Sequence, residues 1–204
     1  MSAPTRRSLL LALPALLAGC STLLQGKPPP KLYTLTPVRE FPPGLPEVRA
    51  QVLVDVPVAP GAIDTERIAL MKGEVSVDYF ADAAWTDRAP VLVQSLLVES
   101  FENTGKIGAI GRDTATLRAD YVLMPELRDF TAVYGNGAVP TVQVRLGLRL
   151  IRVDDRRIIG QRQVQASADA SQDAIIPIVD AFDDALHKVM AETVAWTLTS
   201  VAHG

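Results

Sequence analysis

The sequence predicts an α+β domain, a two-layer sandwich in which a mainly antiparallel sheet carries two helices on one face. Apolar and polar residues alternate along several segments, which is the period of a half-buried strand. In two segments, near the middle of the chain and at its C-terminus, the apolar spacing changes to the three and four residues of an amphipathic helix. Turn-forming residues separate successive strands, which favours hairpins. Helices covering one face of such a sheet bury its apolar side.

The N-terminus has the three parts of a secretory signal. Arg6 and Arg7 form the positive region, residues 8–17 are an apolar run, and Ala18 and Gly19 are small. A helix of about ten residues rises only about 15 Å, half of a bilayer core of about 30 Å, so this run is too short for a permanent transmembrane helix. We therefore expect residues 1–19 to be a signal peptide.

Cys20 is the only cysteine of the chain, and it follows Leu17, Ala18 and Gly19. This tetrapeptide resembles the bacterial lipobox, which implies cleavage between Gly19 and Cys20 and acylation of Cys20. Each buried methylene contributes about 0.8 kcal/mol, so two or three acyl chains would anchor the protein essentially permanently. The alternative is an ordinary signal peptide, or a buried free cysteine.

Two further N-terminal features concern export and sorting. Residues 5–10, Thr-Arg-Arg-Ser-Leu-Leu, resemble a twin-arginine export motif, so the export route stays open. Ser21 stands where lipoproteins retained in the inner membrane often carry Asp. By resemblance to enterobacterial sorting rules, this implies an outer-membrane protein that faces the periplasm.

After the signal, we expect residues 20–46 to form a lipidated tether and residues 47–204 to form the domain. Proline-rich stretches in the tether favour extended, semi-rigid chain, with a short edge strand at residues 31–37 between them. A mature chain of about 185 residues suits one domain with a full core. Without a second cysteine, packing must supply the stability. Loss of the two arginines changes the net charge from −3 to about −5, which does not favour nucleic acid as a partner.

The main strands follow in order along the chain. We expect strands at residues 51–58, 68–71, 75–80, 106–110, 120–133, 141–153 and 158–168, the second and third of which form a hairpin. Pro125 implies an edge or a bulge in its strand. The strand at residues 141–153 is the most regular, with five apolar side chains on one face and polar ones on the other. Gln161, Gln163 and Gln165 continue the polar face, which we expect to be solvated.

Two helices complete the fold. The first should begin after a cap at Thr86 or Asp87, carry Pro90 in its first turn and end at residues 103–105. The second should run from residue 175 to residue 201, with an apolar stripe at three-and-four spacing.

Motifs for catalysis are not found in this sequence. His187 and His203 have no partner at metal-ligand spacing, and His187 is most simply a helix-surface residue. A dinucleotide loop, a phosphate loop and a Gly-x-Ser-x-Gly elbow are all missing. We therefore expect no enzymatic activity, no cofactor and no metal.

Aromatic residues are the candidate binding residues. Tyr79, Phe80 and Trp85 lie within seven positions of a chain with 5% aromatic content. They could contact a partner or a lipid, or they could bury the joint between the hairpin and the first helix. Tyr134, in a glycine-rich turn, is a further candidate contact. The strand with the three glutamines could pair with another chain.

Several of these segments together resemble one family. The run Val75–Phe80 leading to Trp85, the segment Leu32–Leu35 and the segment Ala119–Leu123 resemble the ABC-type transport auxiliary lipoproteins, the PqiC-like proteins. Where family members carry Arg-Trp-Ala, this chain has Ala84-Trp85-Thr86. The similarity extends over about residues 31–200.

The resemblance implies a role without catalysis. Family members are lipoproteins that face the periplasm and work with a mammalian-cell-entry (MCE) domain protein and an ABC permease and ATPase. They are implicated in moving phospholipid between the inner and outer membranes. Phospholipid is therefore a candidate ligand, and an oligomer is a candidate state. An envelope-assembly scaffold or a pilotin lipoprotein is the alternative function.

Overall fold

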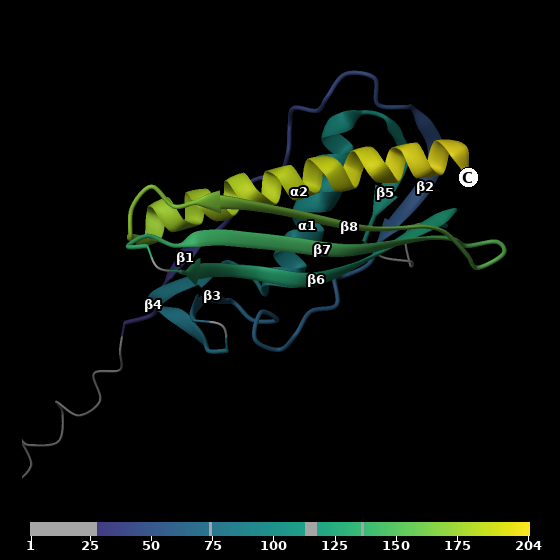
Figure 1. Cartoon of the computed structure of the whole chain (residues 1–204). Coiled ribbons are helices and arrows are strands. Elements are labelled where there is room, and N and C mark those ends of the chain that lie inside the picture. Colours follow the sequence, from purple (N-terminus) through teal and green to yellow (C-terminus); the bar gives the residue numbers. More distant parts are fainter. Residues whose placement is uncertain (1–27, 74, 113–117, 136) are drawn as a thin grey trace, which may run out of the picture.

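The computed structural model describes residues 28–73, 75–112, 118–135 and 137–204, so the signal peptide, Gly19 and Cys20 lie outside the described residues. Ten helices and strands are assigned within the described part of the chain (Figure 1). They are β1 (Lys31–Tyr33), β2 (Val48–Val54), β3 (Arg67–Lys72), β4 (Val77–Trp85), α1 (Ala89–Thr104), β5 (Ile107–Gly111), β6 (Tyr121–Tyr134), β7 (Thr141–Arg152), β8 (Arg157–Asp169) and α2 (Ile175–His203).

The sheet forks at its longest strand, β6. On one side, β6 pairs with β7 along its whole length, and β7 pairs with β8, both antiparallel. On the other side, two shorter strands follow one another along β6: β2 is parallel to residues 121–123 and β3 is parallel to residues 132–134. One branch continues from β2 to β5, and the other from β3 through β4 to β1.

The expectation of a mainly antiparallel sheet is met only in part, because the sheet is mixed. Among the described strands, four of the seven pairings are parallel. Each antiparallel pair joins strands that are consecutive in sequence, as the turn-forming residues predicted. The parallel pairs join segments that a longer connection separates, and turn residues carry no information about them.

Pro125 marks the point where the second side of β6 lacks a regular neighbour. It lies beyond the end of β2 and before the start of β3, and only Val58 bridges to β6 there. The Val58 N–H donates to the Pro125 carbonyl (3.1 Å), and the Leu127 N–H donates to the Val58 carbonyl (2.8 Å). Pro125 therefore removes no hydrogen bond from the sheet, which confirms the predicted local edge. The strand expected at residues 51–58 ends at Val54.

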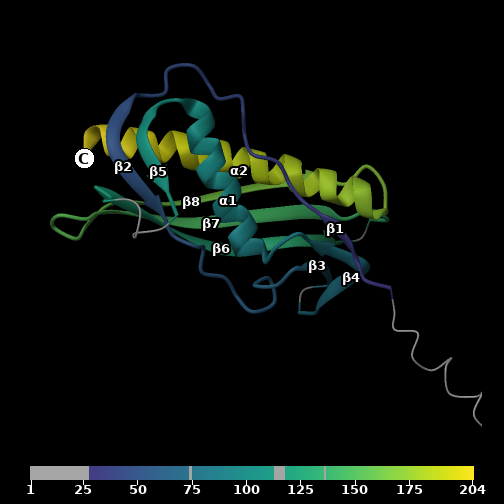
Figure 2. The same cartoon turned by 180° about the vertical axis from the view of Figure 1, so that it is seen from behind.

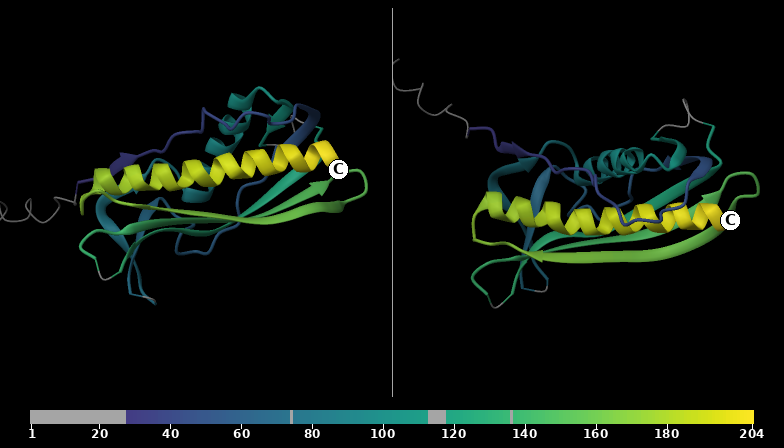
Figure 3. Two further views of the ribbon diagram at one scale, coloured as in Figure 1. Left: turned by 45° about the horizontal axis from the view of Figure 1, so that its top comes forward. Right: turned by 90° about the horizontal axis from the view of Figure 1, so that it is seen from above.

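Both helices lie on the concave face of the curled sheet (Figures 2 and 3). α2 packs on β6, β7 and β8, and α1 packs on β2 and β5 and against α2. α1 begins after Arg88 without a side-chain cap, so the caps expected at Thr86 or Asp87 were wrong. It ends as predicted at Gly105, whose φ of 59° is left-handed. The α+β class and the two helices are thus confirmed, on a curled sheet.

Three aromatic rings join the hairpin, the central strand and the long helix. The ring centroids of Trp85 and Phe182 are 5.1 Å apart, those of Phe130 and Phe182 are 4.9 Å apart, and those of Trp85 and Phe130 are 5.6 Å apart. All three side chains are at most 1% exposed. The cluster therefore ties β4, β6 and α2 into one core.

The folded unit begins well before residue 47, where we expected the tether to end. β1 pairs with the C-terminal part of β4, and Leu35 and Val38 are buried. The Val38 N–H donates to Ser100 Oγ (3.0 Å), and Asn103 Nδ2 donates to the Val38 carbonyl (2.9 Å). Residues 31–46 thus belong to the domain.

Candidate functional site

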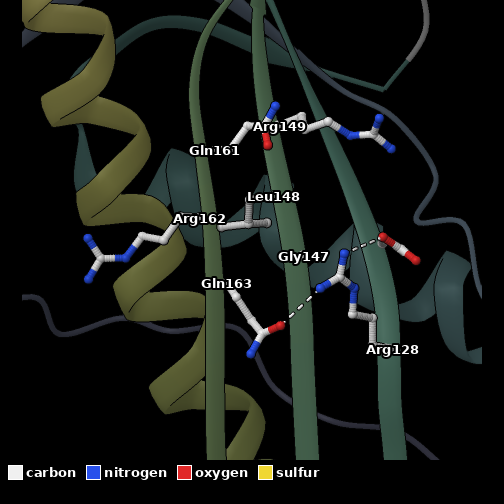
Figure 4. A pocket seen from close by; sticks show the side chains of 8 residues that line it. Arg128, Gly147, Leu148, Arg149, Gln161, Arg162 and Gln163 are labelled. Atoms are coloured by element: carbon white, nitrogen blue, oxygen red, sulfur yellow. Dashed lines mark hydrogen bonds and ion pairs between the residues drawn. The ribbon is translucent and has the colours of Figure 1, made fainter.

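A polar groove crosses the convex face of β6, β7 and β8, opposite the helices (Figure 4). Its volume is about 500 Å³. It is lined by Glu126, Arg128, Gly147, Leu148, Arg149, Gln161, Arg162 and Gln163. Alternation along β7 and β8 places Arg149, Gln161 and Gln163 on this face, because the apolar residues between them are buried against the helices.

Gly147 makes room for a guanidinium group at the centre of the groove. A Cβ atom at this position would lie 2.8 Å from Arg128 Cζ. Arg128 Nη1 donates to Gln163 Oε1 (2.9 Å), and Nη2 donates to Glu126 Oε2 (2.8 Å), as Figure 4 shows. The sequence signal for this site was a glycine inside the most regular strand, which marks a close approach of another group. Sequence reasoning missed it.

Arg149 gives the groove an excess of positive charge. Within the described residues, this exposed side chain has neither a hydrogen bond nor an ion pair. The hydrogen bond from Arg128, with the charges of Arg128 and Arg149, holds the pKa of Glu126 below its ordinary value despite partial desolvation. Arg162 turns away toward α2 and bonds Glu192 (Figure 4). Two guanidinium groups thus face one carboxylate, an arrangement that suits an anionic group of a ligand or partner.

The predicted aromatic contacts do not form one surface. Trp85 is 1% exposed and belongs to the core, so its side chain is not available to a partner. Tyr79 is half-buried: the Arg67 guanidinium lies 3.6 Å from its ring centroid, and its hydroxyl donates to the Ala62 carbonyl (3.2 Å). Phe80 is half-buried against the core. Trp85 is therefore buried at the joint between the hairpin and the first helix.

Tyr134 lies at the end of β6 and links three segments. Its hydroxyl donates to Asp173 Oδ1 (2.5 Å) in the connection between β8 and α2. Lys72 Nζ, at the end of β3, lies 5.6 Å from its ring centroid. Burial, and then the hydrogen bond to Asp173, raise the pKa of Tyr134 to about 12.

His187 has a structural role at the surface of α2. Its Nε2–H donates to the Thr36 carbonyl (2.9 Å). Asp183 Oδ1 accepts the Thr36 N–H, and Asp183 Oδ2 accepts the Thr36 hydroxyl, both at 2.7 Å. These three residues, here called the Thr36 clip, hold the chain after β1 against α2.

The three glutamines predicted to form a polar row, Gln161, Gln163 and Gln165, are exposed on β8. This strand pairs only with β7 in the described sheet. Lys188 Nζ donates to the Ser167 carbonyl of β8 (3.4 Å). In the described ranges, no group of three His, Cys, Asp or Glu side chains could hold a metal ion. In the same ranges, no helix has the length and hydropathy needed to cross a bilayer.

Comparison with known proteins relates this fold to one family and to several solved structures. An uncharacterised protein of Bradyrhizobium diazoefficiens is 28% identical over 192 residues, which are 93% of this chain and 51% of that protein. This chain thus spans about half the length of that relative. A protein of Xanthomonas campestris of known structure is 28% identical, with a TM-score of 0.81 over 85% of this chain and 97% of the other.

More distant structures share the fold alone. A hypothetical protein of Chlamydia trachomatis is 9% identical, with a TM-score of 0.52 over 77% of this chain and all of the other. The model of the ABC-type transport auxiliary lipoprotein component family matches residues 33–194. This range includes most of α2 and every described strand, apart from the first two residues of β1. The family resemblance seen in the sequence is confirmed, and the chain belongs to the ABC-type transport auxiliary lipoprotein component family.

Proposed function

We propose that this protein is an outer-membrane lipoprotein, anchored through Cys20 on the periplasmic face, that assists an ABC and MCE-type system moving phospholipid between the inner and outer membranes. The observation that carries the proposal is the family match over residues 33–194, almost the whole folded domain. The protein acts in this proposal by binding and not by catalysis.

The groove around Arg128 and Arg149 is the proposed docking surface for the partner. A buried glycine and two hydrogen bonds hold Arg128 in place, so little side-chain freedom remains to be lost on binding. Arg149 makes no hydrogen bond or ion pair within the described residues, so its guanidinium is available to an acidic group. An acidic segment of the MCE-domain protein or the permease would fit this charge.

Purification of the tagged protein from native membranes tests the proposal. We expect the MCE-domain protein and the permease to be recovered with it. Arg149→Glu should reduce that recovery at least several-fold, because it reverses the charge in the groove. Arg157→Glu, an exposed arginine of β8 outside the groove, is the matched control and should leave recovery unchanged.

Three results would contradict the proposal or its docking surface. Repeated recovery of a secretin or a lipopolysaccharide-assembly protein instead would favour the scaffold or pilotin function. Intact-mass analysis that finds Cys20 without acyl groups would remove the anchor. Equal loss of the partner in both arginine variants would argue against the groove as the docking surface.

A further inference from the structure

Exposed apolar side chains gather at the end of the domain where the tether leaves it. Among the described residues, nine large apolar side chains are exposed, and five of them lie on β1, on the hairpin of β3 and β4, on the turn after β6 or at the start of α2. These five, here called the apolar rim, are Leu32, Val75, Val77, Val139 and Ile176, with exposed fractions of 63%, 97%, 37%, 38% and 62%.

Strand register and hydrogen bonds place most of the rim at one end. The pairing of Lys72 with Tyr134 brings the hairpin tip beside the end of β6. The bond from Tyr134 to Asp173 brings the start of α2 to the same end. Figures 1 and 2 show residues 28–30, which precede β1, at this end, whereas the C-terminus lies at the opposite one.

We propose that the apolar rim rests on the lipid bilayer to which Cys20 is anchored. This inference depends on the lipid anchor of the proposed function. The length of chain before the domain identifies the lipid bilayer as the surface that the rim contacts. The eleven residue steps from Cys20 to Lys31 span at most about 40 Å when fully extended, and about 34 Å as a semi-rigid proline-rich chain. α2 alone is about 43 Å long. The short tether therefore keeps the rim, and not the opposite end, next to the membrane.

Apolar contact, and not charge, is the basis of this interaction. Lys31 and Lys72 are at the rim, but so are the exposed carboxylates of Asp78, Asp169 and Asp173. A surface with this balance has little attraction for anionic lipids. Exposed branched side chains at one end of the domain can instead enter the boundary between headgroups and acyl chains. Binding should depend little on salt and should occur on zwitterionic lipid.

Depth-dependent fluorescence quenching tests the contact on the full lipidated protein. The acylated Cys20 has no free thiol, so a cysteine introduced by Ile176→Cys takes a single fluorophore. Ile158→Cys, 46% exposed at the turn between β7 and β8, is the matched control at the opposite end. Both proteins are reconstituted in phosphatidylcholine and phosphatidylethanolamine vesicles that contain lipid with a quencher on the upper acyl chain.

We expect the label at position 176 to be quenched several-fold more than the label at position 158, at low and high salt alike. Flotation of the vesicles in the same samples shows whether the anchor holds. If the protein floats and the two labels are quenched equally, the rim does not rest on the bilayer, although the anchor stands. If the protein does not float, the anchor fails and this inference fails with it.

Discussion

At the scale of single residues, the groove depends on the missing side chain of Gly147. In Gly147→Ala, the new Cβ would approach within 2.8 Å of Arg128 Cζ, and the flexible guanidinium would have to move away from Gln163 and Glu126. A surface ion pair contributes about 0–1 kcal/mol, so the free energy of unfolding should fall by no more than about 1 kcal/mol. Recovery of the transport partner should nevertheless fall.

Denaturant unfolding and co-purification measure the two effects of Gly147→Ala separately. Gly61→Ala is the control, because nothing lies within 4 Å of a Cβ at Gly61. Full recovery of the partner by Gly147→Ala would show that the position of Arg128 is unimportant for docking.

A second residue-scale prediction concerns the ionisation of Tyr134. Its pKa is raised from 10.0 to about 12 in the folded protein, so the neutral phenol is favoured there. The resulting stabilisation is complete below pH 10, where the unfolded chain is also neutral, and is lost as the pH rises from 10 to 12. Near-ultraviolet absorbance should show one of the four tyrosines ionising late. Tyr134→Phe should remove that late component, and its persistence would assign the shift to another tyrosine.

At the scale of secondary-structure elements, the Thr36 clip joins the chain after β1 to α2. Asp183→Ala removes the acceptor of two hydrogen bonds, each 2.7 Å long, and leaves the Thr36 N–H without its partner. Because Thr36 is exposed and its freed groups can bond water, we expect a loss of only about 0.5–1.5 kcal/mol in unfolding free energy. Amide exchange in residues 34–38 should accelerate. Asp184→Ala, an exposed neighbour on the same helix, should change neither. Equal exchange in both variants would mean that burial of Leu35 and Val38 alone holds this segment.

At the scale of the whole molecule, the aromatic cluster of Trp85, Phe130 and Phe182 makes the branches of the sheet and α2 one cooperative unit. Phe182→Ala should lower the free energy of unfolding by about 3–5 kcal/mol, because a cavity replaces a fully buried ring. Circular dichroism and tryptophan fluorescence should still report one coincident transition. Ile176→Ala, at an exposed position, should cost no more than about 0.5 kcal/mol. Separate transitions in the wild-type protein would show that α2 unfolds independently.

The elements that were predicted correctly are those whose signal is local. Alternation along β7 places Val142, Val144 and Leu146 in the core, and they are at most 1% exposed. Three-and-four spacing predicted α2, and the left-handed Gly105 ends α1 at the predicted place. The turn-forming residues predicted the antiparallel pairs. Side-chain periodicity determines both the type of an element and its buried face, whatever its neighbours are.

The groove and the Thr36 clip could not be predicted in this way. Arg128 and Gln163 are 35 residues apart, and Thr36 and Asp183 are 147 residues apart. No local pattern relates such positions. The sequence likewise did not determine whether the Trp85 side chain is buried or exposed, because an aromatic residue at the end of a strand can fill a core or face a partner.

By itself, the sequence determined the family and the order of strands and helices, because each is written in consecutive residues. Only the tertiary structure decided that β2 and β3 share one side of β6, that Arg128 and Arg149 line one groove, and that five of the exposed apolar residues gather at one end of the domain. The physical reason is that these features depend on contacts between residues that are far apart in the sequence. The free energy of folding that stabilises such contacts is summed over the whole core and is not encoded in any one segment.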